Sequence, residues 1–85
     1  MGYKLIVKPS AVRDLESLDA DIRKRILKKL TWFISQNNPL SFARHLTNSD
    51  MGEYRFRIGD WRIVFDVSNE TIIIVVIDKR DTIYK

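Results

Sequence analysis

The chain has 85 residues, and its 15 lysines and arginines against 11 aspartates and glutamates give a formal net charge of +4. This length fits one small domain over residues 1–85. The lack of cysteine excludes disulfides and thiolate metal sites, and no apolar run is long enough for a signal peptide or a membrane span. We therefore expect a soluble cytoplasmic protein, and its positive charge favours an anionic partner.

The first part of the chain predicts one strand and two helices. Tyr3–Val7 has the mixed pattern of a short edge strand. Pro9 suits the first position of a helix, where its missing N–H is no loss, and this helix is expected to run to about residue 18. Asp19 can cap a second helix, which is expected to run to about residue 36, where an Asn-Asn-Pro sequence ends it. Together these helices predict a helical hairpin that packs on a sheet.

The second predicted helix has one apolar face and one basic face. The basic side chains are Arg23, Lys24, Arg25, Lys28 and Lys29. Surface helices usually have a charged exposed face, so one interpretation is a solvated surface and the other is a second contact with a phosphate backbone. Trp32, on the same helix, is expected to pack on the core rather than to stack on bases.

The segment from Leu40 to Met51 has the least regular pattern. It predicts a short helical turn over Ser41–Arg44, followed by a loop. His45 is the only histidine in the chain, and no cluster of acidic residues accompanies it. Its intrinsic pKa suits an acid or a base, but the sequence assigns it no partner. We expect neither a metal ion nor a cofactor.

The segment Tyr54–Val67 has the most informative pattern, two alternating apolar and polar runs on either side of Gly59 and Asp60. This pattern predicts an antiparallel hairpin with one buried face. Arg55 and Arg57 share the opposite face, and Arg62 of the second run can join them there. A fold requires the apolar half of this pattern but not the arginines, which are therefore candidates for function.

The last predicted strand, Thr71–Ile77, contains six consecutive β-branched aliphatic residues. Such a run predicts a central strand that is covered on both faces. The element order then predicts an α+β fold, in which an N-terminal strand, a two-helix hairpin and a three-stranded antiparallel meander form one twisted sheet with helices on it.

The hairpin sequence YRFRIGDWRIVF, the aliphatic strand and the C-terminal pattern KRxxxY resemble the RelE/ParE superfamily of toxins from type II toxin–antitoxin systems. The resemblance covers essentially the whole chain and implies the RelE-like architecture, which is similar to that of microbial RNases. It favours the RelE branch, whose members are mRNA interferases: endoribonucleases that cut mRNA in the ribosomal A site and inhibit translation. In these toxins the 2′-hydroxyl attacks the adjacent phosphate and gives a 2′,3′-cyclic phosphate without a metal ion.

The resemblance also implies roles for individual residues. Those implied to be catalytic are Arg62, Arg80 and Tyr84. Those implied to bind RNA are Arg55, Arg57, Lys79 and Lys85. Arg62 is expected to stabilise the charged phosphorane, Arg80 to lie near the scissile phosphate, and Tyr84 to stack on or activate the attacking nucleotide. Arginine suits this chemistry, because it is always charged and can contact phosphate with two hydrogen bonds.

The chain differs from many RelE-like nucleases at the positions of the acid and the base. Lys79 stands where many of them have a histidine before the C-terminal arginine, and Arg44-His45-Leu46 lies near the place where some supply a glutamate. Tyrosine has an intrinsic pKa of about 10, so Tyr84 would need Arg80 and its neighbours to lower its pKa before it could act as a base. The chain is closest to members that have basic residues and a tyrosine but no histidine.

Two alternatives remain open from the sequence: a ParE-like toxin that inhibits DNA gyrase, and a non-catalytic nucleic-acid-binding relative. The resemblance further implies a cognate antitoxin that wraps the toxin and covers its basic face. No DNA-reading motif is recognisable in the chain, so specific DNA binding is expected to belong to the antitoxin.

Overall fold

The computed structural model describes residues 2–47, 50 and 52–79. Its elements in chain order are β1 (Lys4–Val7), α1 (Pro9–Glu16), α2 (Ala20–Ile34), the 3₁₀ helix η1 (Pro39–Phe42), β2 (Arg44–His45), β3 (Tyr54–Ile58), β4 (Trp61–Ser68) and β5 (Thr71–Lys79). The strands form one sheet in the order β1-β5-β4-β3-β2, in which β1 is parallel to β5 and the other pairs are antiparallel. The predicted α+β class is confirmed, with β3, β4 and β5 as the meander and β1 at an edge.

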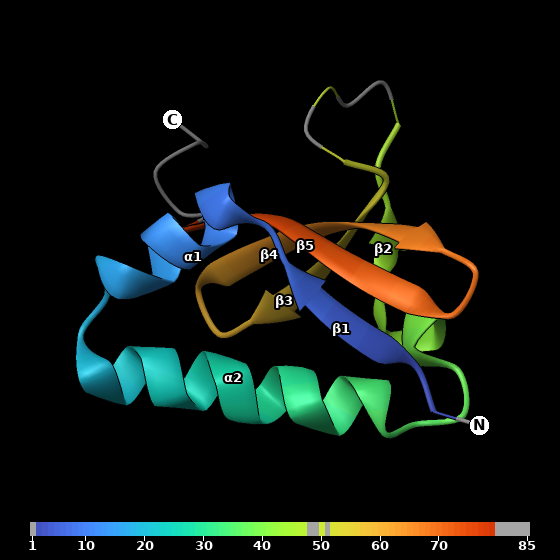
Figure 1. The fold of residues 1–85 in the computed structure, drawn as a ribbon, viewed down its shortest axis with the longest axis horizontal. Coiled ribbons are helices and arrows are strands. Elements are labelled where there is room, and N and C mark those ends of the chain that lie inside the picture. Colours follow the sequence, from blue (N-terminus) through green and yellow to red (C-terminus); the bar gives the residue numbers. More distant parts are fainter. Residues whose placement is uncertain (1, 48–49, 51, 80–85) are drawn as a thin grey trace.

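The core lies between one face of the sheet and the helices (Figure 1). Helix α2 runs across this face and buries Ile26, Leu30 and Phe33, whose spacing places them on one side of the helix. Phe33 stacks on Phe56 of β3, with ring centroids 4.1 Å apart, and Phe56 stacks in turn on Phe65 of β4 at 4.4 Å. An aromatic stack therefore joins α2 to the middle of the sheet.

Both helices end two residues earlier than predicted, at Glu16 and Ile34. A serine follows each of them: the hydroxyls of Ser17 and Ser35 donate hydrogen bonds, at 2.7 and 2.6 Å, to backbone carbonyls three residues earlier. Serine competes in this way with the helical hydrogen bonds, which favours a helix end. Asp19 occupies the N-cap position of α2 as predicted, but within the described part of the chain its side chain makes no capping hydrogen bond.

The short helical turn predicted around Ser41–Arg44 is present but lies two residues earlier, and the segment that follows is not entirely a loop. The turn is the 3₁₀ helix η1, which begins at Pro39 and ends at Phe42, and Arg44 and His45 form the short strand β2 at the edge of the sheet. Periodicity cannot reveal a strand of two residues, because it contains a single alternation.

Strand β5 lies between β1 and β4, so its predicted interior position is correct. It contains a bulge: Ile74 and Val76 face adjacent residues of β4, which leaves Val75 without a counterpart. The extra residue reverses the alternation, so Ile74 and Ile77 are both buried although they are three positions apart. The other face of β5 is half-buried rather than fully covered as predicted.

Helix α1 covers the part of β5 that extends beyond β1. Strand β1 pairs with Thr71–Ile74 only. Beyond that, the Ser10 hydroxyl donates a 2.7 Å hydrogen bond to the carbonyl of Val75, and Asp14 Oδ2 accepts one of 2.9 Å from the N–H of Ile77. Side chains of α1 thus satisfy backbone groups of β5 where the neighbouring strand ends.

Candidate nucleic-acid interface

The strand register places four arginines on the sheet face that points away from α2. Arg57 of β3 lies directly opposite Arg62 of β4, and Arg55 lies opposite Arg44 of β2. Residues directly opposite each other in an antiparallel pair point to the same side, so these four side chains share one surface, which we call the arginine face. The register agrees with the prediction that Arg55, Arg57 and Arg62 share a face, and it adds Arg44.

The requirements of folding do not explain the arginine face, because its like charges destabilise the sheet. Like charges directly opposite each other destabilise a sheet, and this face contains two such pairs, Arg44–Arg55 and Arg57–Arg62. Arg44 and Arg57 are exposed, and Arg55 is half-buried. Concentrated arginines on an exposed strand face provide a binding surface for a polyanion.

Arg62 is held in place by Asp78 of β5, its direct neighbour in the register. Its Nε and Nη2 donate to the two carboxylate oxygens of Asp78 at 3.0 and 2.8 Å. The Arg62 side chain is only 14% exposed, and that of Asp78 is 36% exposed. A carboxylate that accepts two parallel hydrogen bonds fixes the plane of a guanidinium, so Asp78 fixes the orientation of Arg62.

The segment before β3 passes over the same side of the sheet. Val64 points to the arginine face, opposite Arg55, yet it is 0% exposed. A Cβ atom added to Gly52 would lie 2.7 Å from Val64 Cγ1 and 3.3 Å from the carbonyl oxygen of Phe65. Only glycine fits at such a close approach, so the backbone at Gly52 packs directly on Val64 and contributes to its burial.

We expect Gly52→Ala to lower the free energy of unfolding by about 1–3 kcal/mol, since the new methyl group overlaps a buried side chain and a strand backbone. Urea unfolding followed by circular dichroism measures this change. Gly2→Ala is the control, because a Cβ at Gly2 would meet only Ile34 O at 3.9 Å, an ordinary contact. Equal stability of the two variants would contradict the prediction.

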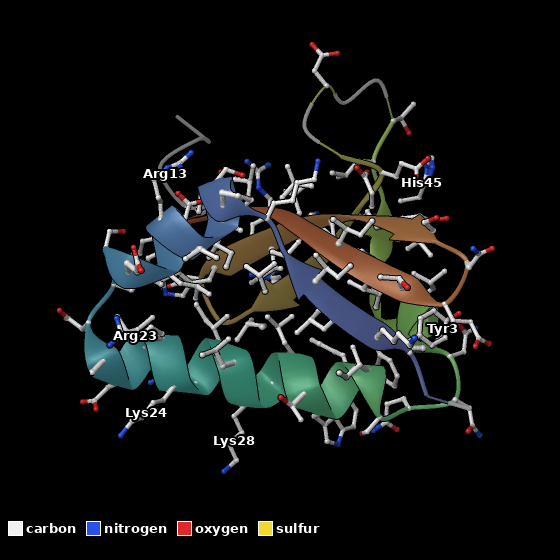
Figure 2. All side chains as sticks on the ribbon, viewed as in Figure 1. Tyr3, Arg13, Arg23, Lys24, Lys28 and His45 are labelled. Atoms are coloured by element: carbon white, nitrogen blue, oxygen red, sulfur yellow. The ribbon has the colours of Figure 1, made fainter. Side chains whose placement is uncertain are left out.

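His45 lies on the other side of the sheet from the arginines. It is opposite Tyr54, whose ring it contacts edge-on with centroids 5.1 Å apart. Figure 2 shows it at the far edge of the sheet. Arg44, rather than His45, is thus the residue of this segment that lies on the arginine face. The sequence did not predict this position, because it assigned Arg44 to a helical turn.

The structure does not bring all the predicted site residues together. Lys79 is paired with Trp61, on the face that packs against the helices, so it is not part of the arginine face. Arg80, Tyr84 and Lys85 lie outside the described residues. Asp78 is the functional candidate that sequence reasoning missed, since its position beside Arg62 depends on the bulge in β5.

Two predictions for α2 need correction. Arg23 is not a solvated member of its basic face, because Nη1 donates to the carbonyls of Leu18 and Leu15 at 3.2 and 3.4 Å and so links α2 to the end of α1. Trp32 is not in the core: it is 43% exposed, although its ring contacts Phe33 edge-on. Lys24 and Lys28 point away from the sheet (Figure 2).

The family follows from comparison with known sequences. The sequence model of the ParE toxin of type II toxin–antitoxin systems, parDE, matches residues 5–84. The chain belongs to this family. No curated protein sequence matches it significantly.

None of the described helices has the length and apolar character needed to cross a membrane. In the part of the chain that the structure describes, no three potential metal ligands form a cluster.

Solved structures of RelE toxins have the same fold as this ParE-family chain. The RelBE2 toxin–antitoxin complex of Mycobacterium tuberculosis contains a chain with a TM-score of 0.70 and 25% identity, over 94% of this chain and 100% of that one. The RelB–RelE complex of Methanococcus jannaschii gives a TM-score of 0.69 and 26% identity, over 93% and 94%. A mutant of E. coli RelE in the free state gives a TM-score of 0.74 and 17% identity, over 98% of this chain and 88% of that one. At this identity the likeness shows the fold alone. The RelE/ParE assignment is thereby confirmed.

Proposed function

We propose that this toxin is a RelE-like mRNA endoribonuclease that acts on message in the ribosomal A site and inhibits translation. The observation that carries the proposal is the arginine face, on which Asp78 orients Arg62 while Arg55 and Arg57 extend the positive surface along the hairpin. The likeness to RelE chains at 25% and 26% identity supports the same branch.

The reaction needs charge stabilisation more than any other contribution. The 2′-oxygen of one nucleotide forms a bond to the adjacent phosphorus, the bond from phosphorus to the 5′-oxygen breaks, and a proton passes from the 2′-hydroxyl to a base while the 5′-oxygen gains one. Negative charge builds up on the non-bridging oxygens, where preorganised donors have their largest effect. Arg62 is the described residue best suited to this role, because its orientation is fixed before RNA binds.

The other arginines would bind the RNA backbone. Arg44, Arg55 and Arg57 lie on the same surface as Arg62 and would position successive phosphates beside it. The roles of Arg80 near the scissile phosphate and of Tyr84 as base or stacking residue stay predictions from the resemblance, as do RNA contacts by Lys79 and Lys85.

The proposal includes a protein antitoxin as partner. Structurally similar chains come from toxin–antitoxin complexes of Mycobacterium tuberculosis and Methanococcus jannaschii. An antitoxin segment over the arginine face would pair its charges and exclude RNA at the same time, and specific binding to operator DNA would belong to the antitoxin.

Asp78→Asn tests whether Arg62 needs to be oriented. We expect the variant to bind RNA as well as the parent, because it loses a negative charge, but to cleave at least about tenfold more slowly, since misplaced catalytic groups act poorly. Single-turnover cleavage on programmed ribosomes separates the two effects. Asp66→Asn is the control, because the carboxylate of Asp66 accepts a hydrogen bond from the N–H of Glu53 and not from Arg62. Parallel losses of binding and rate would argue against a positioning role.

DNA gyrase inhibition is the second candidate, since the matching family model is that of ParE. Primer extension on a reporter mRNA in a translation extract separates the two. We expect new ends within codons, only on translated message and absent with the Arg62→Ala/Arg80→Ala variant. Intact mRNA together with inhibited gyrase supercoiling would overturn the nuclease proposal and establish the ParE alternative, whereas RNA binding without either effect would indicate a non-catalytic relative.

A further inference from the structure

Two successive carbonyl groups of β5 point away from β4 at the bulge. The carbonyl of Ile74 accepts a hydrogen bond of 2.9 Å from the N–H of Lys8, the N-cap residue of α1, and that of Val75 accepts one of 2.7 Å from the hydroxyl of Ser10. In a regular strand successive carbonyls point to opposite neighbours, so two on the same side mark the extra residue of a bulge. The start of α1 therefore binds both carbonyls that the bulge turns outward.

Asp14, one turn further along α1, binds the next backbone group on the same side of β5. Its Oδ2 accepts a hydrogen bond of 2.9 Å from the N–H of Ile77, the residue directly before Asp78. Ser10 and Asp14 are four positions apart, so their side chains leave the same side of the helix. We call this pair of side chains the α1 clasp, because it holds β5 at the bulge and again two residues beyond it.

The bulge decides on which side of the sheet Asp78 lies. Ile72 and Ile74 are buried in the core, so unbroken alternation would place residue 78 on the core side as well. The extra residue shifts the pattern by one, so Ile77 is buried and Asp78 lies opposite Arg62. A shift of one residue moves every following side chain to the other face. Loss of the bulge would therefore remove Asp78 from the arginine face.

We infer that Ser10 and Asp14 are positioning residues, which keep the bulge in β5 and thereby hold Asp78 in its contact with Arg62. The bulge turns one carbonyl more than a regular strand does toward α1, and a backbone carbonyl without a partner is unfavourable. Ser10 supplies that partner. The charged carboxylate of Asp14 makes a stronger hydrogen bond than a neutral group, and it fixes the peptide unit next to Asp78.

The consequence for catalysis rests on the proposed function, whereas the consequence for the contact between Arg62 and Asp78 does not. Attachment of α1 to the sheet is the simpler role for the same hydrogen bonds. Attachment alone predicts that the clasp variants lose stability while the orientation of Arg62 is unchanged. A positioning role predicts that the orientation of Arg62 changes as well, so the two roles differ in a measurable way.

The first test needs no RNA. The Nε–H group of Arg62 donates to Asp78, and its signal in proton–nitrogen NMR spectra is assigned by its absence from Arg62→Lys. We expect Asp14→Ala to speed the exchange of this proton with water at least about tenfold, and Ser10→Ala to speed it about threefold, because hydrogen exchange reports local opening. Asp14→Asn should stay within about twofold of the unmodified protein, because its amide oxygen can accept the same hydrogen bond.

Phe42→Ala is the control for general destabilisation, since it removes a ring from η1 that is 46% exposed. It should leave the exchange of the Arg62 proton within about twofold. Equal acceleration by Phe42→Ala and Asp14→Ala would reduce the clasp to simple attachment, and unchanged exchange in both clasp variants would refute it. Ser10→Ala loses only a neutral hydrogen bond, so it decides the matter if Asp14→Ala does not fold.

The second test asks whether the clasp acts through Asp78. In single-turnover cleavage on programmed ribosomes, Asp14→Ala should lower the rate about tenfold without a change in RNA affinity. In the Asp78→Asn background the same substitution should lower the rate further by less than about twofold, because residues that act through one another are not additive. Additive losses would contradict the inference. If the unmodified protein cleaves no mRNA while the Arg62 proton responds as expected, the proposed function fails and the positioning role stands.

Discussion

Arg62→Ala is expected to lower the rate of mRNA cleavage by about 10²–10³-fold, the usual loss when one preorganised donor to a developing negative charge is removed. Arg62 is the least exposed partner of its ion pair and is fixed by two hydrogen bonds to Asp78. Its removal therefore eliminates a donor that no mobile surface side chain can replace at the same place. Single-turnover cleavage of mRNA on purified ribosomes measures the loss.

Two further variants make this result specific. Arg62→Lys keeps the charge but cannot make the forked contact with Asp78, so most of the activity should still be lost. Arg57→Ala removes the exposed arginine directly opposite, and we expect about tenfold weaker RNA binding with a smaller effect on the rate of cleavage. Because Asp78 is 36% exposed and hence still solvated, Arg62→Ala should remain folded by circular dichroism. Full activity in Arg62→Ala would exclude this residue from the chemistry.

Phe56→Ala is expected to have the largest effect on stability, a loss of about 3–5 kcal/mol in the free energy of unfolding. Its ring is fully buried between Phe33 and Phe65, with centroids 4.1 and 4.4 Å away. Small domains are stable by only about 5–15 kcal/mol, so the melting temperature should fall by more than about 10 °C. Thermal unfolding followed by circular dichroism tests this expectation.

Phe42→Ala is the matched control for this substitution. It removes the same side chain from η1, where the ring is 46% exposed and only borders the aromatic stack. We expect a loss below about 1.5 kcal/mol, because little apolar area returns to water. If the two variants melted at the same temperature, the stack would not be the centre of stability that its burial indicates.

The alternation of the hairpin is strong enough to predict much of this molecule from the sequence. The first strand of the hairpin alternates apolar residues with Arg55 and Arg57, and the second begins with the same alternation at Arg62. Between them lies Gly59, whose φ of 59° suits glycine at a turn. That pattern fixes which side of the sheet Arg55 and Arg57 occupy. The helices, the meander and the family signature also follow from local periodicity and motifs, because each of these is encoded within a few neighbouring residues.

What the sequence did not reveal depends on contacts between distant segments. The pairing of Arg62 with Asp78 requires the bulge at Val75, and a run of six β-branched residues hides any change in alternation. The position of Arg44 depends on a strand of two residues.

The cover that α1 provides along β5 has a consequence for the protein in concentrated solution. Open strand edges recruit strands from other molecules, which leads to aggregation. Here the two outermost strands have only four and two residues, and Ser10 and Asp14 occupy the backbone groups of β5 beyond the shorter neighbour. A second molecule therefore finds little continuous edge on which to extend the sheet. Such protection favours a monodisperse state for a chain that is rich in β-branched residues.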